Sequence, residues 1–223
     1  NVRMMMVDSN KRRKIASNFE GINMLTSFSA DGKKVVYCAS RGDGNCQMYY
    51  HENGVFKRLL YTDPSTGKSL SDGNNISPAM SHDGSMVYFC SDFQTHLPQL
   101  YAYDIGASGV KKITDGGYCA SPAYSHKTAQ LAYTKKVDGI MQLCLFNTKT
   151  GIHQQLTTDE YSKDECSWSP CGNYLLVSIE KNNNCRIAVY NLLTKQLQPI
   201  TPESVVCGYP SWSPLYSNYT LAT

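Results

Sequence analysis

The sequence predicts an all-β protein, a β-propeller made of four-stranded antiparallel blades. Along its 223 residues one phrase recurs: a short apolar strand, an Asp-Gly turn and a second apolar strand. Repeats of about 44 residues that hold four short strands are typical of propeller blades. The turn glycine, or the residue in its place, falls at Gly32, Gly84, Thr128, Gly172 and Tyr216, one step of 52 residues and three of 44. The polar residue that closes the third strand repeats in the same way, at Asp8, Glu52, Asp104, Asn147 and Asn191.

The repeat that begins at Ser77 illustrates the four strands. Two of them, expected near 78–81 and 86–90, flank the turn "HDGS", where Asp-Gly supplies the backbone angles of a tight hairpin. The alternating segment "QLYAYD" predicts a third strand near 98–103, and "VKKIT" predicts a fourth near 109–114. No segment places apolar residues at sustained helical spacing, so helices should be rare.

The two ends of the chain look like complementary parts of one blade. Residues 1–24 would supply its third and fourth strands, and residues 210–223 its first and second. Such a composite blade closes a ring and removes exposed sheet edges, so we expect about five blades. We expect one propeller domain over residues 1–223, with whole repeats at approximately 25–76, 77–120, 121–165 and 166–209.

Composition restricts the possible partners. A net charge of +3 is too small to indicate nucleic acid or an anionic membrane as the main partner, and no apolar run is long enough to span a bilayer. Because the chain opens on Asn1, within a strand-like segment, we expect it to be a piece of a longer protein. The nine cysteines include no CxxC pair, which argues against a zinc site; packed free thiols are expected, with one or more disulfides as the alternative.

Catalytic patterns are weak. A serine hydrolase would need G-x-S-x-G, which does not occur, and the five histidines hold different roles within the repeat, so they should not converge on a metal. Asp164 and Glu165 form an acidic pair before an innermost strand and are expected to be solvated. Trp168 and Trp212 alternate with serine on first strands and are expected to pack between blades. We therefore expect no catalysis, no cofactor and no metal.

The phrases "SFSADGKKVVY", "SPAMSHDGSMVYF", "YAYDIGASGVKKITDG" and the closing "YPSWSPLY" resemble the WD40-like repeats of TolB-type propellers, over essentially the whole chain. The resemblance implies a periplasmic six-bladed propeller, preceded by an α/β domain, that binds the peptidoglycan-associated lipoprotein Pal over its channel mouth. This sequence departs from that pattern in its five blades and its missing α/β domain. The same repeat also builds propellers of prolyl-oligopeptidase-type peptidases, tricorn-like proteases and oligogalacturonate lyases, so it identifies the fold better than the function.

Binding is expected at the loops that enter the innermost strands, at 21–25, 73–77, 117–121, 162–166 and 206–210. They should surround one mouth of the channel, and their mixture of tyrosines, amides and hydroxyls is typical of protein interfaces. The resemblance adds Asn74, Ser77 and Ala120 as matches to partner-sensitive positions of the family. The candidate partner-binding residues are Asn23, Asn74, Asn75, Ser77, Tyr118, Ala120, Ser121, Lys163, Asp164 and Tyr209.

Together these expectations describe a non-catalytic, periplasmic, monomeric propeller that binds a Pal-like lipoprotein and supports the integrity of the cell envelope. Nucleic acid and direct membrane insertion are not expected. Two alternatives remain at this point: a carbohydrate-binding or lyase-type propeller, and the propeller part of a prolyl-oligopeptidase-like peptidase.

Overall fold

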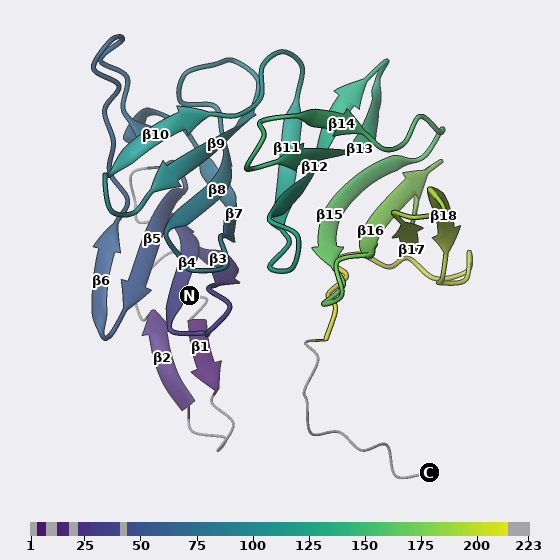
Figure 1. Ribbon diagram of the computed structural model, residues 1–223, viewed down its shortest axis with the longest axis horizontal. Coiled ribbons are helices and arrows are strands. Elements are labelled where there is room, and N and C mark those ends of the chain that lie inside the picture. The colour runs from purple at the N-terminus through teal and green to yellow at the C-terminus, as the bar shows by residue number, and fades with distance from the viewer. Residues whose placement is uncertain (1–3, 8–12, 18–21, 41–43, 214–223) are drawn as a thin grey trace. The chain divides into compact units, whose positions relative to one another are not determined.

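The computed structural model describes residues 4–7, 13–17, 22–40 and 44–213. These residues form four four-stranded antiparallel sheets and one two-stranded sheet (Figure 1). Their helical content is one 3-10 turn, Leu70–Asp72, so the expectation that helices are rare is confirmed. The chain folds as two compact units, residues 1–124 and 125–223.

The first unit holds two complete blades. In each blade the strands pair in chain order, and the innermost strands β3, β7 and β11 lie against one another in that order. The first blade consists of β3 (Ile22–Phe28), β4 (Lys34–Ser40), β5 (Gln47–Glu52) and β6 (Val55–Arg58), and the second of β7 (Asn75–Met80), β8 (Met86–Ser91), β9 (Gln99–Asp104) and β10 (Gly109–Lys112). The unit also includes β1 (Met4–Val7), β2 (Arg13–Ser17) and β11 (Cys119–Tyr124).

The third blade has the strand order β11-β12-β13-β14, and the fourth the order β15-β16-β17-β18. The second unit contains all of these strands except β11. Their bounds are β12 (Gln130–Val137), β13 (Ile140–Asn147), β14 (His153–Gln155), β15 (Ser162–Trp168), β16 (Tyr174–Lys181), β17 (Asn184–Asn191) and β18 (Gln196–Pro199).

The Asp-Gly hairpins form as predicted, and the turn at Asp83 shows why. Gly84 has φ +67°, a left-handed conformation that glycine adopts without strain. The Asp83 carboxylate accepts hydrogen bonds from the Ser81 hydroxyl at 2.7 Å, the Ser85 amide at 3.0 Å and the Ser85 hydroxyl at 2.8 Å. These bonds stabilise the charged form and lower the pKa of Asp83 to about 2. Neighbouring residues therefore shape the turn, and Lys34 of the preceding blade adds a bond from Nζ to the Asp83 carbonyl at 3.1 Å.

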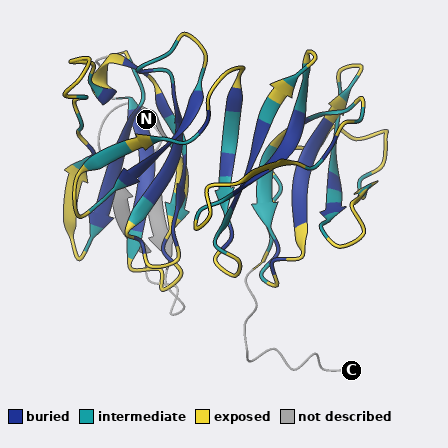
Figure 2. Cartoon of the chain, turned by 45° about the horizontal axis from the view of Figure 1, so that its top comes forward, coloured by how far each residue is buried: buried dark blue, intermediate teal, exposed yellow. Residues whose placement is uncertain are grey.

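The hydrophobic core lies in the middle strands of the blades, which Figure 2 shows as mostly buried. In the first unit it joins β4 and β5 of one blade to β8 and β9 of the next, through residues such as Met48, Phe89 and Tyr101. In the second unit Trp168 packs against a cluster that includes Leu143 and Leu175. Because this cluster draws on both the third and the fourth blade, the expected inter-blade role of Trp168 is confirmed.

The predicted count of five blades is wrong: the described residues form four. In the described part of the chain, β1 and β2 pair with each other and form a two-stranded sheet. Residues 207–213 keep the contacts of a fifth innermost strand, as shown below, but they have no strand partner within the described residues. The rest of the expected C-terminal half-blade, 214–223, lies outside those residues. The repeated turn residue identifies where a repeat lies in the sequence. A complete blade also requires its second strand to pair with its first.

Candidate partner-binding loops

The loop that enters an innermost strand is fixed in the same way at successive blades. A residue at the start of the innermost segment donates its amide to the main chain at the beginning of the third strand of the preceding blade, or just before it. Equivalent bonds give the loops equivalent positions on their blades. The three bonds run from Asn75 to Cys46 (2.8 Å), from Cys119 to Pro98 (3.0 Å) and from Cys207 to Cys185 (2.9 Å).

One residue near the start of each innermost segment adopts a left-handed φ, which costs a non-glycine residue roughly 1–2 kcal/mol. In β3, β7 and β15 this residue lies at a β-bulge, which re-aims the neighbouring side chains. Its recurrence at repeat spacing makes it part of the blade design. The five positions are Leu25, Ser77, Ser121, Glu165 and Tyr209, with φ of 50°, 53°, 51°, 55° and 56°. Tyr209 keeps this geometry although it lies in no assigned strand.

Buried glutamine side chains hold three of these loops in place through hydrogen bonds. A glutamine at the start of the third strand donates its amide to a carbonyl of the loop that enters the next blade. Each of these glutamines is buried, so the bond is shielded from water. The bonds run from Gln47 to Gly73 (3.1 Å), from Gln99 to Gly117 (2.5 Å) and from Gln142 to Asp159 (2.7 Å).

A threonine just after the fourth strand completes this support. It follows Leu or Ile in the repeat, as in "VKKIT". The Thr157 hydroxyl donates to Gln142 Oε1 at 2.7 Å and accepts the amide of Leu143 at 3.0 Å. Thr114 makes the equivalent bonds to Gln99 at 2.9 Å and Leu100 at 2.9 Å. Sequence reasoning missed this network, although the recurring glutamine in "QMYYHE", "QLYAYD" and "QLCLFN" is a signal that could have revealed it.

Asn75 is part of the support in the first unit. Its side chain is buried and donates to the Leu70 carbonyl at 2.7 Å and to Gln47 Oε1 at 3.0 Å, and it accepts the Ser91 hydroxyl at 2.8 Å. Asn74, the residue before it, is exposed, and its side-chain oxygen Oδ1 accepts a hydrogen bond from the main-chain amide of Cys46 at 3.2 Å. Asn74 is therefore the side chain of this pair that reaches the surface.

The loop before β11 presents an aromatic side chain. Tyr118 is 37% exposed and directly precedes the strand. Ala120 and Ser121 are half-buried, as is Ser77 at the equivalent bulge of the preceding blade. The first unit thus combines an exposed tyrosine with polar and small groups on loops of one type. Asn23 lies in β3, and its side chain is outside the described part.

In the second unit Lys163 occupies the position equivalent to Asn75. Its side chain is fully buried; Nζ donates to Gln142 Oε1 at 3.0 Å and to the Tyr161 carbonyl at 2.6 Å, and it forms an ion pair with Asp159. Burial lowers the pKa of Lys163, and the charge and hydrogen bond of Asp159 oppose that shift. The amine therefore stabilises the loop from inside.

The surface of the second unit at this end comes from Asp164 and Tyr209, both exposed. Tyr209 is 79% exposed, the highest value among the large hydrophobic side chains of the described chain. Its amide donates to Glu165 Oε2 at 2.5 Å, and the same oxygen accepts the Ser178 hydroxyl at 2.8 Å. The main chain is thus anchored while the ring remains in solvent.

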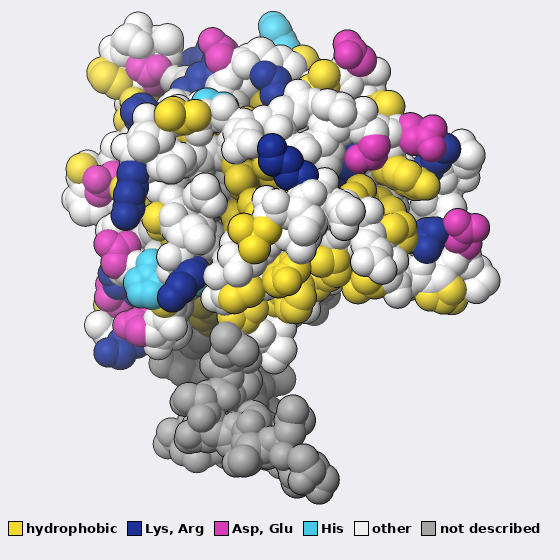
Figure 3. Space-filling view, turned by 45° about the vertical axis from the view of Figure 1, so that its right-hand side comes forward, with side chains coloured by type: hydrophobic (Ala, Val, Ile, Leu, Met, Phe, Trp, Pro, Cys, Tyr) yellow, Lys and Arg dark blue, Asp and Glu magenta, His cyan; other side chains and the backbone are white. Residues whose placement is uncertain are grey.

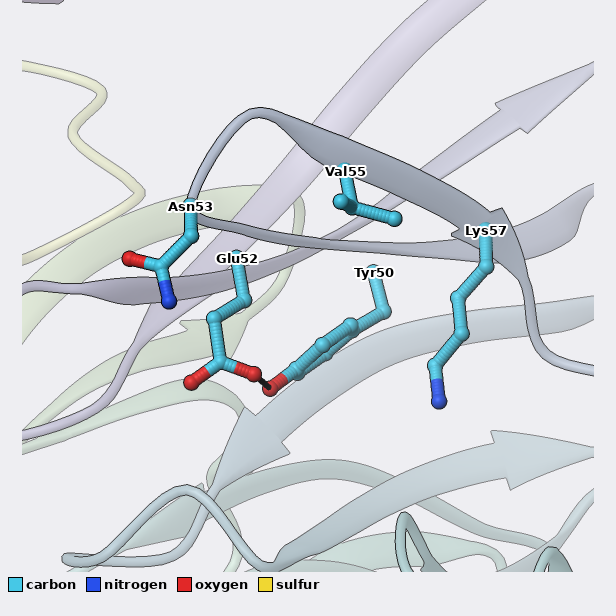
Figure 4. Close-up of a pocket in the computed structure, with 5 residues that line it drawn as sticks. All are labelled: Tyr50, Glu52, Asn53, Val55 and Lys57. Atoms are coloured by element: carbon cyan, nitrogen blue, oxygen red, sulfur yellow. Dashed lines mark hydrogen bonds between the residues drawn. The ribbon is translucent and has the colours of Figure 1, made fainter.

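A shallow pocket of about 280 Å³ lies elsewhere, at the β5–β6 hairpin (Figure 4). The Tyr50 hydroxyl donates to Glu52 Oε2 at 2.9 Å, and Lys57 Nζ lies 5.2 Å from the centre of the Tyr50 ring. Burial raises the pKa of Tyr50, and its bond to Glu52 adds to the shift. Three of its polar residues, Tyr50, Glu52 and Lys57, interact with one another, which disfavours this pocket as the candidate site.

Charged side chains are scattered over the face shown in Figure 3, with both signs interspersed. In the ranges that the structure describes, no three or more His, Cys, Asp or Glu residues are grouped so that they could hold a metal ion. No helix in those ranges is long and apolar enough to cross a membrane.

Comparison with known proteins identifies the family. The TolB beta propeller domain pattern matches residues 1–216. A TolB homolog of Chlorobaculum tepidum is 26% identical over 129 residues, which are 58% of this chain and 28% of that protein. TolB from Acinetobacter baumannii has a similar fold, with a TM-score of 0.73 at 18% identity over 90% of this chain and 49% of its own.

The fold is shared more widely. A puromycin-hydrolyzing peptidase of Mycobacterium tuberculosis has a TM-score of 0.64 at 10% identity, over 91% of this chain and 32% of its own. The chain spans less than half the length of the Chlorobaculum tepidum and Acinetobacter baumannii TolB proteins. On its sequence match and its blades, the chain belongs to the TolB β-propeller domain family.

Proposed function

We propose that this chain is a non-catalytic protein-interaction domain whose partner docks on the loops that enter the innermost strands. One observation carries the proposal: the loops are held from inside by buried polar side chains, while tyrosines remain at the surface. Gln142 and Lys163 illustrate the support, and Tyr118 and Tyr209 the surface.

This arrangement favours binding for a physical reason. A loop that is already ordered loses little conformational entropy when a partner docks, so more of the contact energy appears as affinity. Tyrosine is enriched among the residues that dominate protein interfaces, because it combines a large apolar area with a hydrogen-bonding hydroxyl. Asn74 and Asp164 add exposed polar groups beside the tyrosines in their own units.

The partner that we propose is a Pal-type peptidoglycan-associated lipoprotein in the periplasm, where the interaction would support the cell envelope. This step rests on membership of the TolB propeller family and on the position of the loops. It concerns this domain alone, since the chain spans 28% of the Chlorobaculum tepidum relative.

The test is a binding titration with the soluble domain of the Pal-type lipoprotein from the same organism. Each of Tyr118→Ala and Tyr209→Ala is expected to weaken binding by about 5- to 30-fold, the effect of losing about 1–2 kcal/mol of contact energy. Tyr174→Ala is the matched control, because Tyr174 is 36% exposed but lies beside the hairpin turn before β16.

The control separates a binding site from a general effect of losing a surface ring. Tyr174→Ala should keep the affinity of the unmodified chain. The proposal fails if the unmodified chain does not bind the lipoprotein at tens of micromolar, or if all three variants bind equally well.

A further inference from the structure

Two cysteines meet where the fourth blade joins residues 207–213. The amide of Cys207 donates to the carbonyl of Cys185 at 2.9 Å. Standard backbone dimensions together with this bond keep the two Cα atoms within about 7 Å of each other. Disulfides form between Cα atoms about 4.4–6.8 Å apart, so the backbone holds this pair at a suitable distance.

The two thiols also share an environment. Both residues are half-buried, and all nine cysteines are free thiols in this structure. Burial raises the pKa of Cys185, and the nearby charges of Glu165, Glu180 and the Cys207 thiolate raise it further. The two thiols therefore lie within electrostatic range of each other, at a junction that the main-chain bond already fixes.

The other junctions of this kind provide an internal comparison. At the equivalent main-chain bonds Cys46 meets Asn75, and Cys119 meets Pro98. Among these junctions in the described chain, that of Cys185 and Cys207 alone has a thiol on both sides. The segment that begins at this junction, residues 207–213, also has no strand partner within the described residues.

We propose that Cys185 and Cys207 form a disulfide that fastens residues 207–213 to the fourth blade. The oxidant is a second disulfide, either a small-molecule disulfide such as oxidised glutathione or a protein of that chemistry. One cysteine thiolate attacks it, forming a mixed disulfide and releasing one thiol; the other cysteine thiolate then displaces the second thiol. Two electrons and two protons pass to the oxidant, and one sulfur–sulfur bond forms in the chain.

The bond would restrain the segment that carries Tyr209. In the reduced structure three main-chain amides hold this segment. The Cys207 amide donates to the Cys185 carbonyl, the Tyr209 amide to the Glu165 carboxylate, and the Trp212 amide to the Ser167 hydroxyl at 3.2 Å. A covalent link at the first residue prevents the segment from detaching as a whole, because its entry point can no longer leave the blade. The site does not depend on the identity of the partner.

The experiment is peptide mapping of the folded protein after equilibration with oxidised glutathione in excess and quenching with an alkylating agent. After digestion with trypsin, the disulfide should link the peptide 182–186 to the peptide that begins at Gln196. The linked species should have the summed mass of the two peptides minus two hydrogen atoms. Reduction should separate the two peptides. Hydrogen exchange at the Cys207 amide should slow by about tenfold or more on oxidation, because opening of the segment is restricted.

Three variants sharpen the test. Cys185→Ser and Cys207→Ser should each abolish the joined peptide and leave the remaining cysteine as a mixed disulfide with glutathione, which shows that its thiol is accessible. Cys171→Ser is the control, because Cys171 is an exposed thiol on a turn of the same unit and should not affect the link. Mixed disulfides at Cys185 or Cys207 in the unmodified chain, without the joined peptide, would overturn the proposal.

Discussion

Replacing Thr157 with valine removes one buried hydroxyl from the second unit and leaves the shape of the side chain almost unchanged. Thr157 is 6% exposed, and its hydroxyl accepts the Leu143 amide and donates to Gln142 Oε1. The Leu143 amide would lose its partner in a buried place, which costs about 1–3 kcal/mol. Gln142 Oε1 would keep Lys163, so its loss is smaller, about 1 kcal/mol or less.

The two contributions predict that Thr157→Val lowers the free energy of unfolding by about 1–4 kcal/mol. Urea unfolding followed by tryptophan fluorescence measures it, because both tryptophans of the chain, Trp168 and Trp212, lie in the second unit. With a denaturant dependence of about 2 kcal/mol per molar urea, the midpoint should fall by about 0.5–2 M.

Thr150→Val is the matched control for this measurement. Thr150 is exposed, and its hydroxyl accepts the Ile152 amide at 3.4 Å, where water can replace it. This variant should change the free energy of unfolding by less than about 0.5 kcal/mol. Equal midpoints for Thr157→Val and Thr150→Val would refute the view that the buried threonines support the loops.

Three further predictions concern charged or reactive groups. Lys163→Met should lower the free energy of unfolding by about 1–3 kcal/mol, measured with urea, because Asp159 loses its partner but stays partly hydrated. Asp83 has a lower pKa in the folded chain than in the unfolded chain, so its contribution to stability is present above about pH 4 and is lost towards pH 2. The difference in free energy of unfolding between the unmodified chain and Asp83→Ala should therefore fall over that range from about 1 kcal/mol towards zero. The Ser169 hydroxyl lowers the pKa of Cys171, so Ser169→Ala should slow alkylation of Cys171 at pH 7; an unchanged rate would contradict this.

The strands and hairpins could be predicted from the sequence because their causes are local. The turn at Asp83 and Gly84 has local bonds between residues two to five positions apart, such as those of Ser81 with Asp83 and Met86. The expected strands near 86–90 and 98–103 correspond to β8 (Met86–Ser91) and β9 (Gln99–Asp104). Alternating side chains and a tight turn are sufficient to define a hairpin.

The interior of the candidate site could not be predicted in this way. Asn75 and Lys163 were grouped with the exposed loop residues because they are polar. They are buried because Gln47 and Gln142 of the preceding blade provide partners 28 and 21 residues away. The blade count failed for a related reason, since strand pairing at the chain ends depends on contacts between distant residues.

Hydrogen exchange of the chain, with and without the soluble domain of the Pal-type lipoprotein, is the measurement that tests the central claim most directly. The account predicts slower exchange in peptides that contain Tyr118 and Tyr209, and no change in the β5–β6 hairpin around Val55. Slower exchange confined to that hairpin or to the turn before Tyr174, with the two loops unaffected, would contradict it.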